Sequence, residues 1–336
     1  HLLFNRYRVS MTGKSPVMHK IIKKKCKIPV DKPAWVRYTT QENKEGRCIR
    51  LTSRRRQRGQ QRQQSTRRGG LFCCADAESI RVFILDWRCF GISKVHDDVV
   101  DESDKRRGQS SVNAIYNNKV SVLVGDYMLA TSLKHAALTG KVELVELVAT
   151  LGQELSEGEI LQLGNIGKED FSEEAYFDVI RKKTAALFKA SSQSGAVSVG
   201  AVQEEVMKAG LLGEMIGIAF QIKDDIFDYF ESPELGKPTG NDMLEGKLTL
   251  PALYVLSQTG DDSLKQTALK IRSLEASKEE IASFVETVKE RGGIEYATRM
   301  MYEFRDKALA LVPASADSSL KEALTAYIDY VIERNK

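Results

Sequence analysis

Two short clusters of aspartates constrain this chain more than any other feature of its sequence. One reads DDVVD and the other DDIFD, so each places carboxylates at positions i, i+1 and i+4. Carboxylates this close repel one another, and beside apolar surface they need a counter-charge. The fold must therefore bring cations to both clusters. Their members are Asp97, Asp98, Asp101, Asp224, Asp225 and Asp228.

Both clusters have the spacing of a helix face. Successive residues of an α-helix turn by about 100°, which places Asp97 and Asp101 one turn apart on the same side. A solvated acidic face is one interpretation of such a cluster. The apolar neighbours, such as Val99, Ile226 and Phe227, favour carboxylates that lie beside buried surface.

The types of side chain around the clusters indicate what they bind. Carboxylate oxygens without histidine or cysteine favour a hard cation, and Mg²⁺ is commonly shared between a few carboxylates and substrate phosphates. Basic residues follow each cluster, and arginine offers a forked donor that matches phosphate oxygens. We therefore expect a diphosphate site between two helices that face one cavity. The basic residues are Arg106, Arg107, Lys237 and Lys247.

The rest of the chain from about Ser110 has the hydrophobic period of α-helices, without period-two alternation. This predicts an all-α bundle. The segment 111–139 is apolar on nearly every face, so we expect that helix to be buried on all sides. The other predicted helices cover 141–163, 172–190, 203–230, 294–312 and 317–334.

Local signals refine these helices. Ser172, followed by two glutamates, predicts a helix start, and Ser277 with Glu280 predicts a capping box. Gly213 and Gly217 predict a helix face that a neighbouring backbone approaches closely.

Residues 1–94 have a different composition from the remainder. They hold 23 Lys and Arg against 6 Asp and Glu, whereas residues 95–336 hold 27 against 40. An RNA-binding tail, a disordered extension and a stretch outside the natural reading frame are the three interpretations. The first methionine is Met11, which fits an open fragment. We expect an atypical basic segment, disordered or mis-framed, before a helical domain over 95–336, and no nucleic-acid partner.

Several classes of protein are disfavoured. The five cysteines lack paired metal-ligand spacing. No apolar run reaches the roughly 18 residues of a membrane span, and no signal peptide is evident. These observations predict a cytoplasmic protein without a cysteine metal site and without stable membrane insertion.

The segments DDVVDESDKRRG and QIKDDIFD, the latter followed by GKPTGND, resemble the two aspartate-rich motifs of trans-isoprenyl diphosphate synthases, the polyprenyl synthetases of bacterial medium- or long-chain type. The resemblance extends from about Val95 to Lys336 and includes LSEGEILQL, RKKTAALF and EGKLTLPAL. Terpene cyclases usually carry an Asn/Ser/Glu-type triad in place of the second motif, so the second cluster favours chain elongation.

The resemblance implies an isoprenoid-synthase-type bundle around a deep apolar cavity, usually in a homodimer. Its substrates would be isopentenyl diphosphate and an allylic prenyl diphosphate, with three Mg²⁺ ions. Asp97 and Asp101 would ligate two of the ions and Asp224 the third. The other three aspartates would support them.

The resemblance also assigns roles to basic and polar residues. Arg106 would contact the allylic diphosphate and Arg107 the isopentenyl diphosphate. Lys237 and Lys247 would bind the leaving diphosphate. The developing allylic cation would be lined by Lys183, Thr184 and Gln221.

The sequence departs from the family before the first cluster, where the family has a Gly-Gly-Lys-Arg motif that holds isopentenyl diphosphate. Here the region reads RLTSRRRQRGQQRQQ. Ile92 and Ser93, at the positions that set product length in the family, favour medium or long chains. The departure also leaves an alternative open, in which the chain is a defective or non-catalytic subunit that dimerises with an active synthase and regulates it.

Overall fold

Long helices that lie side by side form most of the described chain. The computed structural model describes residues 36–43, 46–53, 94–106, 109–165, 171–230, 239–314 and 316–334. The chain divides into two units, His1–Asp76 and Ala77–Lys336, and each unit is described by itself.

The described residues of the second unit are all-α, as predicted, apart from one very short antiparallel strand pair. Residues 94–100 are helical, and the pair β3 (Lys105–Arg106) and β4 (Gln109–Ser110) follows. The remaining elements are α4 (Val112–Ile115), α5 (Asn118–Ala137), α6 (Val142–Asn165), α7 (Glu173–Ile180), η1 (Arg181–Ala185), α8 (Ala186–Ser198), α9 (Gln203–Phe227), α10 (Asn241–Leu244), α11 (Leu250–Gln258), α12 (Asp262–Arg272), α13 (Lys278–Glu290), α14 (Gly293–Ala310) and α15 (Ser318–Glu333).

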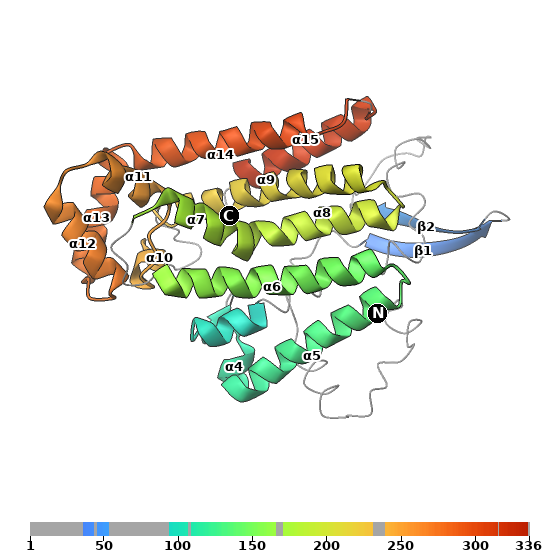
Figure 1. The fold of residues 1–336 in the computed structure, drawn as a ribbon, viewed down its shortest axis with the longest axis horizontal. Coiled ribbons are helices and arrows are strands. Elements are labelled where there is room, and N and C mark those ends of the chain that lie inside the picture. Colours follow the sequence, from blue (N-terminus) through green and yellow to red (C-terminus); the bar gives the residue numbers. More distant parts are fainter. Residues whose placement is uncertain are drawn as a thin grey trace, which may run out of the picture. The chain divides into compact units, whose positions relative to one another are not determined.

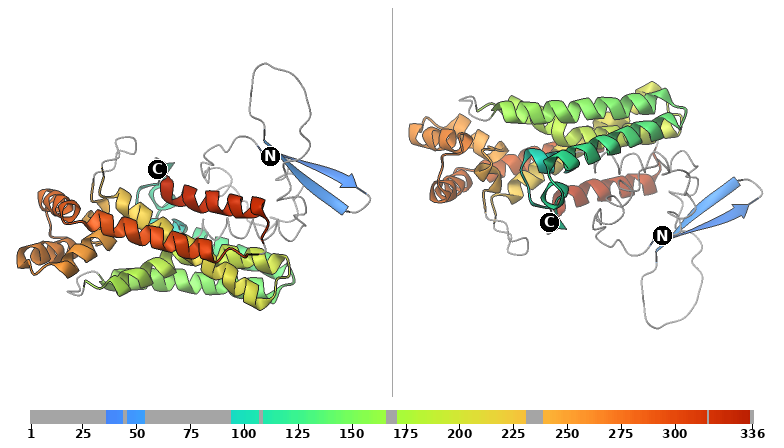
Figure 2. Two further views of the ribbon diagram at one scale, coloured as in Figure 1. Left: turned by 90° about the horizontal axis from the view of Figure 1, so that it is seen from above. Right: turned by 90° about the horizontal axis from the view of Figure 1, so that it is seen from below.

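Helix α9 is the centre of this unit. It packs against α8, α14 and α15, and Figure 1 shows α14, α9, α8 and α6 running along one another, with α10–α13 gathered at one end. The views in Figure 2 place α15 beside α14. The core formed in this way includes Ile218 and Ile222 of α9, which are fully buried. The second aspartate cluster therefore lies at the C-terminal end of this central helix.

The predicted helix start at Ser172 and the predicted capping box are confirmed. The Ser172 hydroxyl accepts a hydrogen bond from the backbone N–H of Ala175. Ser277 and Glu280 exchange hydrogen bonds at the start of α13. Gly292, with φ of 80°, follows the end of α13.

The predicted close approach at Gly213 and Gly217 is also confirmed. A Cβ atom at Gly213 would overlap the carbonyl oxygen of Phe188 on α8. At Gly217 a Cβ would lie 2.6 Å from the Cα of Ala185, well inside van der Waals contact. Only glycine lets α8 and α9 pack this closely.

A π-helical turn interrupts the helix that the sequence predicts over 172–190. The turn is η1, between α7 and α8. It lies against α6, where a Cβ at Gly158 would be 2.8 Å from the backbone nitrogen of Lys183. Turns of this kind are frequent at functional sites, and this one carries Lys183 and Thr184.

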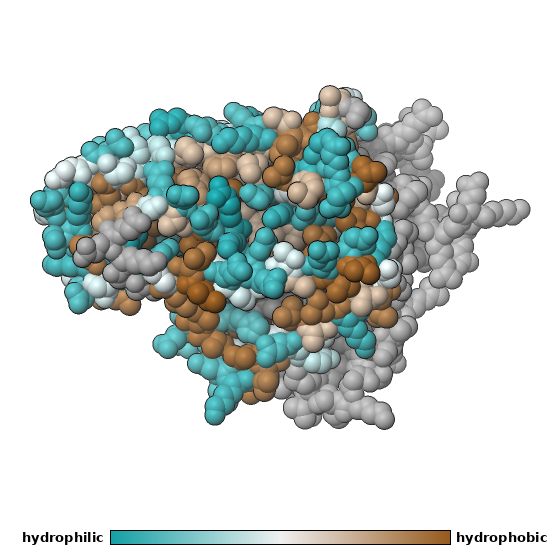
Figure 3. All heavy atoms as spheres, in the orientation of Figure 1, coloured by the Kyte–Doolittle hydropathy of each residue, from teal (hydrophilic) through white to brown (hydrophobic). Residues whose placement is uncertain are grey.

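The prediction that the 111–139 helix is buried on all sides is wrong for the single chain. Helix α5 packs on α4 and α6 and leaves Leu123 63% exposed. Figure 3 shows apolar surface over α5 and α6. The helix is apolar on nearly every face, as the sequence indicates. It lies at an edge of the bundle, however, so one face has no neighbour within the described residues.

The first unit contains a hairpin that the sequence analysis did not predict. Strands β1 (Val36–Asn43) and β2 (Gly46–Ser53) are antiparallel, with Val36 opposite Ser53 and Asn43 opposite Gly46. The Arg-rich run that follows this hairpin lies outside the described residues, so the three interpretations of residues 1–94 stay predictions.

Among the helices that the structure describes, none combines the length and the apolar character needed to cross a membrane.

The packing at Gly213 makes a prediction about stability. Gly213→Ala should lower the free energy of unfolding by about 1–3 kcal/mol because the new methyl group forces α8 and α9 apart. Gly195→Ala is the matched control, since Gly195 lies exposed in α8 with no atom within 4 Å of its would-be Cβ, and it should raise the free energy of unfolding by about 0.5–1 kcal/mol. Urea denaturation measures both, and equal effects would contradict the packing argument.

Candidate active site

A cavity of about 200 Å³ lies between the end of α6, α7, η1, α9 and the segment before α11. Five residues that the sequence singled out line it, from both halves of the helical unit. They are Lys183, Thr184, Gln221, Asp225 and Lys247.

A chain of hydrogen bonds joins three of these residues. The Thr184 hydroxyl donates to Gln221 Oε1 at 2.7 Å, and Gln221 Nε2 donates to Asp225 Oδ1 at 2.7 Å. The other carboxylate oxygen, Asp225 Oδ2, accepts from the Tyr176 hydroxyl at 2.6 Å. Each member therefore fixes the orientation of the next, and the chain holds Thr184 and Gln221 on the cavity wall.

Burial is the main influence on the pKa values of Asp225 and Tyr176 in this hydrogen-bonded chain. Asp225 is 3% exposed, and its burial, followed by the negative charge of Asp242, raises the pKa of its carboxyl well above the usual value, against the opposing hydrogen bonds from Tyr176 and Gln221. Burial and the neighbouring Asp225 carboxylate likewise raise the pKa of the Tyr176 hydroxyl. Tyr176 therefore stays protonated and remains a hydrogen-bond donor.

The first aspartate cluster occupies a helical turn, as its spacing predicts. The backbone N–H of Asp101 donates to the carbonyl of Asp97 at 2.8 Å. Asp98 is 5% exposed, and its carbonyl accepts from the Asn113 amide at 3.0 Å. Asn113 also donates to the carbonyl of Ser103, so it ties down the segment that follows the cluster.

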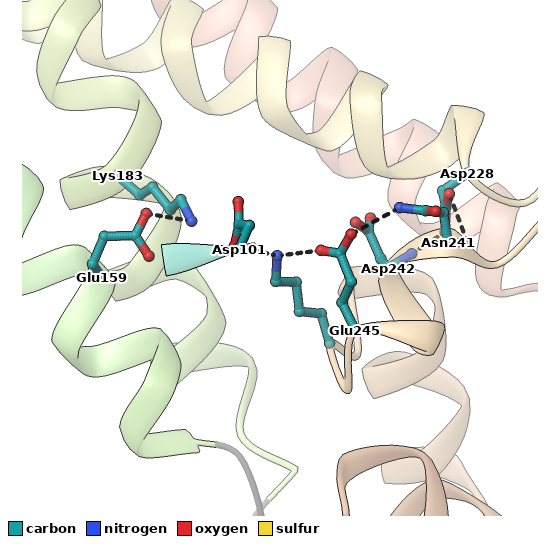
Figure 4. Close-up of polar contacts among 8 residues, drawn as sticks. Asp101, Glu159, Lys183, Asp228, Asn241, Asp242 and Glu245 are labelled. Carbon is teal, nitrogen blue, oxygen red and sulfur yellow. Dashed lines mark hydrogen bonds and ion pairs between the residues drawn. The ribbon is translucent and has the colours of Figure 1, made fainter. Parts of the chain in front are cut away.

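Lys247 connects the first cluster to the region after the second. Its Nζ lies 3.7 Å from Asp101 Oδ1 and 2.6 Å from Glu245 Oε2. Burial alone would lower the pKa of Lys247, but the hydrogen bond and charge of Glu245, with the charges of Asp101 and Asp242, outweigh it and raise that pKa. Figure 4 shows Asp101 between Lys183 and Glu159 on one side and Glu245 and Asp242 on the other.

The remaining aspartates of the second cluster have different partners. Asp224 Oδ1 accepts a hydrogen bond at 2.6 Å from the guanidinium of Arg334. Arg334 is the residue immediately after α15. The Asp228 carboxylate accepts from the backbone N–H groups of Asn241 and Asp242 at 3.1 and 3.0 Å. Asp228 thereby holds the start of α10 and, with it, the acid Asp242 at the cavity.

Several predicted residues lie outside what the structure describes. Arg107, Lys237, Ile92 and Ser93 are among the undescribed residues, and Arg106 is described only as backbone in β3. Their assigned roles stay predictions.

The candidate ligands for a divalent cation near the cavity are carboxylates. Within the described ranges, no three His, Cys, Asp or Glu side chains gather closely enough to hold a metal ion by themselves. Mg²⁺ needs no such cage, because it is usually held by one or two carboxylates and completes its shell with water and substrate phosphates. Asp101, whose side chain lies near Lys247 and is 26% exposed, fits a cation held in that way.

Sequence reasoning missed five residues that hold the site together. Glu159 pairs with Lys183 and Glu245 pairs with Lys247, yet neither stands out in a charged surface pattern. Asp242 is the last residue of the turn-forming segment GKPTGND and could have been found as a further acid beside the second cluster. Tyr176 and Arg334 contact their aspartates only through the tertiary fold.

Comparison with known proteins decides the family. The sequence model of the polyprenyl synthetase family matches residues 91–288. The octaprenyl diphosphate synthase of Escherichia coli strain K12 is 33% identical over 243 residues, which cover 72% of this chain and 75% of that protein. The chain belongs to the polyprenyl synthetase family.

Other members of the family agree in sequence and fold. Heptaprenyl diphosphate synthase component 2 of Geobacillus stearothermophilus is 36% identical over 70% of this chain and 74% of its own. The crystal structure of geranylgeranyl pyrophosphate synthase from Bacteroides thetaiotaomicron is 52% identical, with a TM-score of 0.69 over 76% of this chain and 81% of that chain. The polyprenyl synthase of Caulobacter crescentus CB15, crystallised with calcium and isoprenyl diphosphate, is 30% identical, with a TM-score of 0.71 over 78% of this chain and 80% of that chain.

The hydrogen bond to the buried carboxylate makes a second prediction. Tyr176→Phe removes a donor to Asp225 and should lower the free energy of unfolding by about 1.5–3 kcal/mol. The control Tyr330→Phe changes a side chain that is 69% exposed and should alter it by less than about 0.5 kcal/mol. Denaturation in urea measures both. A Tyr176→Phe variant as stable as the control would show that the hydroxyl does not hold Asp225.

Proposed function

We propose that this polyprenyl synthetase is a prenyltransferase that condenses isopentenyl diphosphate with an allylic prenyl diphosphate and so elongates a trans-polyprenyl diphosphate. The observation that carries the proposal is the position of Lys247, which follows the second aspartate cluster and lies 3.7 Å from Asp101 of the first. This contact supports a single site that both clusters would serve, beside a cavity lined by Lys183, Thr184 and Gln221.

The clusters are suited to hold divalent ions, which we propose to be Mg²⁺, three in number. Asp97 and Asp101 would hold two ions and Asp224 the third. Asp98, Asp225 and Asp228 would support these ligands, and the contacts of Asp225 and Asp228 with their own partners support such a role. Bound Mg²⁺ would supply positive charge to the diphosphate as it departs.

The chain's own cations and polar groups supply the rest of the chemistry. In the proposed reaction the allylic C–O bond breaks with its electrons going to the diphosphate, the alkene of isopentenyl diphosphate attacks the allylic carbon, and a proton is lost. Lys247 and Lys237 would bind the leaving diphosphate, and Arg106 and Arg107 the two substrates' diphosphates. The Thr184–Gln221 pair on the cavity wall would present oxygen atoms rather than a positive charge to the allylic carbon, which would favour a developing cation.

A homodimer is the proposed assembly. Leu123 on α5, together with Val142 and Ile160 on α6, is at least 63% exposed in the single chain, and such apolar surface is typical of an interface. A second copy of this chain would cover it.

The metal assignment predicts the effect of removing single carboxylates. Asp97→Asn and Asp224→Asn should each lower kcat/KM for condensation by about 100-fold or more, because the Mg²⁺ that would stabilise the departing diphosphate loses a ligand. Circular dichroism should show the helical fold intact. Asp262→Asn, at an exposed position at the start of α12, is the control and should leave the rate unchanged. Wild-type turnover in either test variant would overturn the assignment.

Product length is decided by one assay. The purified chain is incubated with Mg²⁺, labelled isopentenyl diphosphate and allylic primers of increasing size, and the products are sized. The relatives named above range from a geranylgeranyl to an octaprenyl diphosphate synthase, so products from four to eight isoprene units are the expected range. A chain that binds Mg²⁺–diphosphate but never elongates a primer would instead support the non-catalytic subunit.

A further inference from the structure

One ion pair at the cavity wall contains a carboxylate to which the proposed chemistry assigns no role. Lys183 Nζ lies 2.5 Å from Glu159 Oε1, and Lys183 lines the cavity. Both side chains are largely buried, with 22% and 18% exposed. Figure 4 shows the two side chains facing each other between α6 and η1.

The backbone around this pair is built for close contact. The π-helical turn η1 carries Lys183, and Gly158, immediately before Glu159, lets α6 approach the backbone nitrogen of Lys183. The carboxylate and the ammonium are therefore brought together by backbone packing, not only by flexible side chains.

A second ion pair beside it provides a comparison. Lys182 Nζ lies 2.6 Å from Glu157 Oε2, and it joins the same two elements. Its side chains are 37% and 58% exposed, so solvent screens it. Lys182 is not among the residues that line the cavity.

The location of Lys183 creates an electrostatic conflict. An ammonium ion attracts a diphosphate, but it repels an allylic carbon that becomes positive as the diphosphate leaves. In a partly buried site both effects are stronger than in water. A carboxylate next to the ammonium reduces both of them.

We propose that Glu159 is a positioning residue that holds Lys183 at the cavity wall and offsets its positive charge. The pair then weakens the binding of a diphosphate in the ground state and, with Lys183 beside the allylic carbon, reduces the repulsion that the developing cation meets. This inference rests on the proposed function for its kinetic part, whereas its binding part concerns a diphosphate alone.

The test separates charge from structure. Glu159→Gln keeps an oxygen that accepts a hydrogen bond from Lys183 but removes the negative charge. We expect the Kd for Mg²⁺–pyrophosphate, measured by calorimetry on the full chain, to fall about threefold to tenfold. We expect kcat for condensation to fall about tenfold or more while KM for the allylic substrate falls as well.

The control is Glu157→Gln, which removes the same charge from the exposed pair. Both the Kd and kcat of this variant should stay within about twofold of the wild type, since screening weakens that pair. A purely structural role of Glu159 would raise the Kd and lower kcat together.

A second comparison covers the case in which Glu159→Gln fails to fold. Lys183→Gln leaves the Glu159 carboxylate without its ammonium partner and should bind Mg²⁺–pyrophosphate more weakly than the double variant Glu159→Gln/Lys183→Gln, by about threefold or more. Equal affinities of these two variants would overturn the proposal, as would a Glu159→Gln variant that binds no more tightly than the wild type.

The two proposals fail in different ways. A wild-type chain that binds Mg²⁺–pyrophosphate but does not condense substrates would reject the proposed function, and the affinities would still decide the role of Glu159. A chain that condenses substrates with the same kinetics after Glu159→Gln would reject only the inference about Glu159.

Discussion

The structure depends on giving each carboxylate of the crowded second acidic cluster its own partner. Asp225 is buried and accepts hydrogen bonds from Tyr176 and Gln221. Asp228 accepts from backbone N–H groups, and Asp224 accepts from Arg334. Because each of these carboxylates has its own hydrogen-bond partners, the three can lie close together beside the apolar core.

Close approach of helix backbones also shapes the site. Close packing at Gly213 brings α8 against α9, and Gly158 brings α6 against the π-helical turn. The turn then presents Lys183 and Thr184, which are adjacent in sequence, to the same cavity. Helix packing and site geometry are therefore one arrangement, and a methyl group at either glycine would disturb both.

Residue types and spacing alone predicted the two aspartate clusters and the basic residues that follow them, including Lys247. Lys183, Thr184 and Gln221 were named only through the family resemblance; they line the cavity with Asp225 and Lys247, and their roles stay predictions. The Gln221–Asp225 bond follows from the i,i+4 spacing of a helix, whereas the Tyr176–Asp225 and Arg334–Asp224 contacts join α7 and the end of α15 to α9. Contacts between residues so far apart in the sequence leave no periodic pattern from which they could be predicted.

The linear sequence is enough to predict that the chain from residue 95 is helical and that two acidic helix faces need cations. Hydrophobic period, caps and charge spacing act over a few residues, so they can be recognised without the fold. The packing of distant helices sets which partner each carboxylate of the second cluster receives and which face of α5 stays exposed. Those outcomes depend on how distant helices pack, and a helix carries no mark of whether its apolar face will meet a neighbour within the same chain.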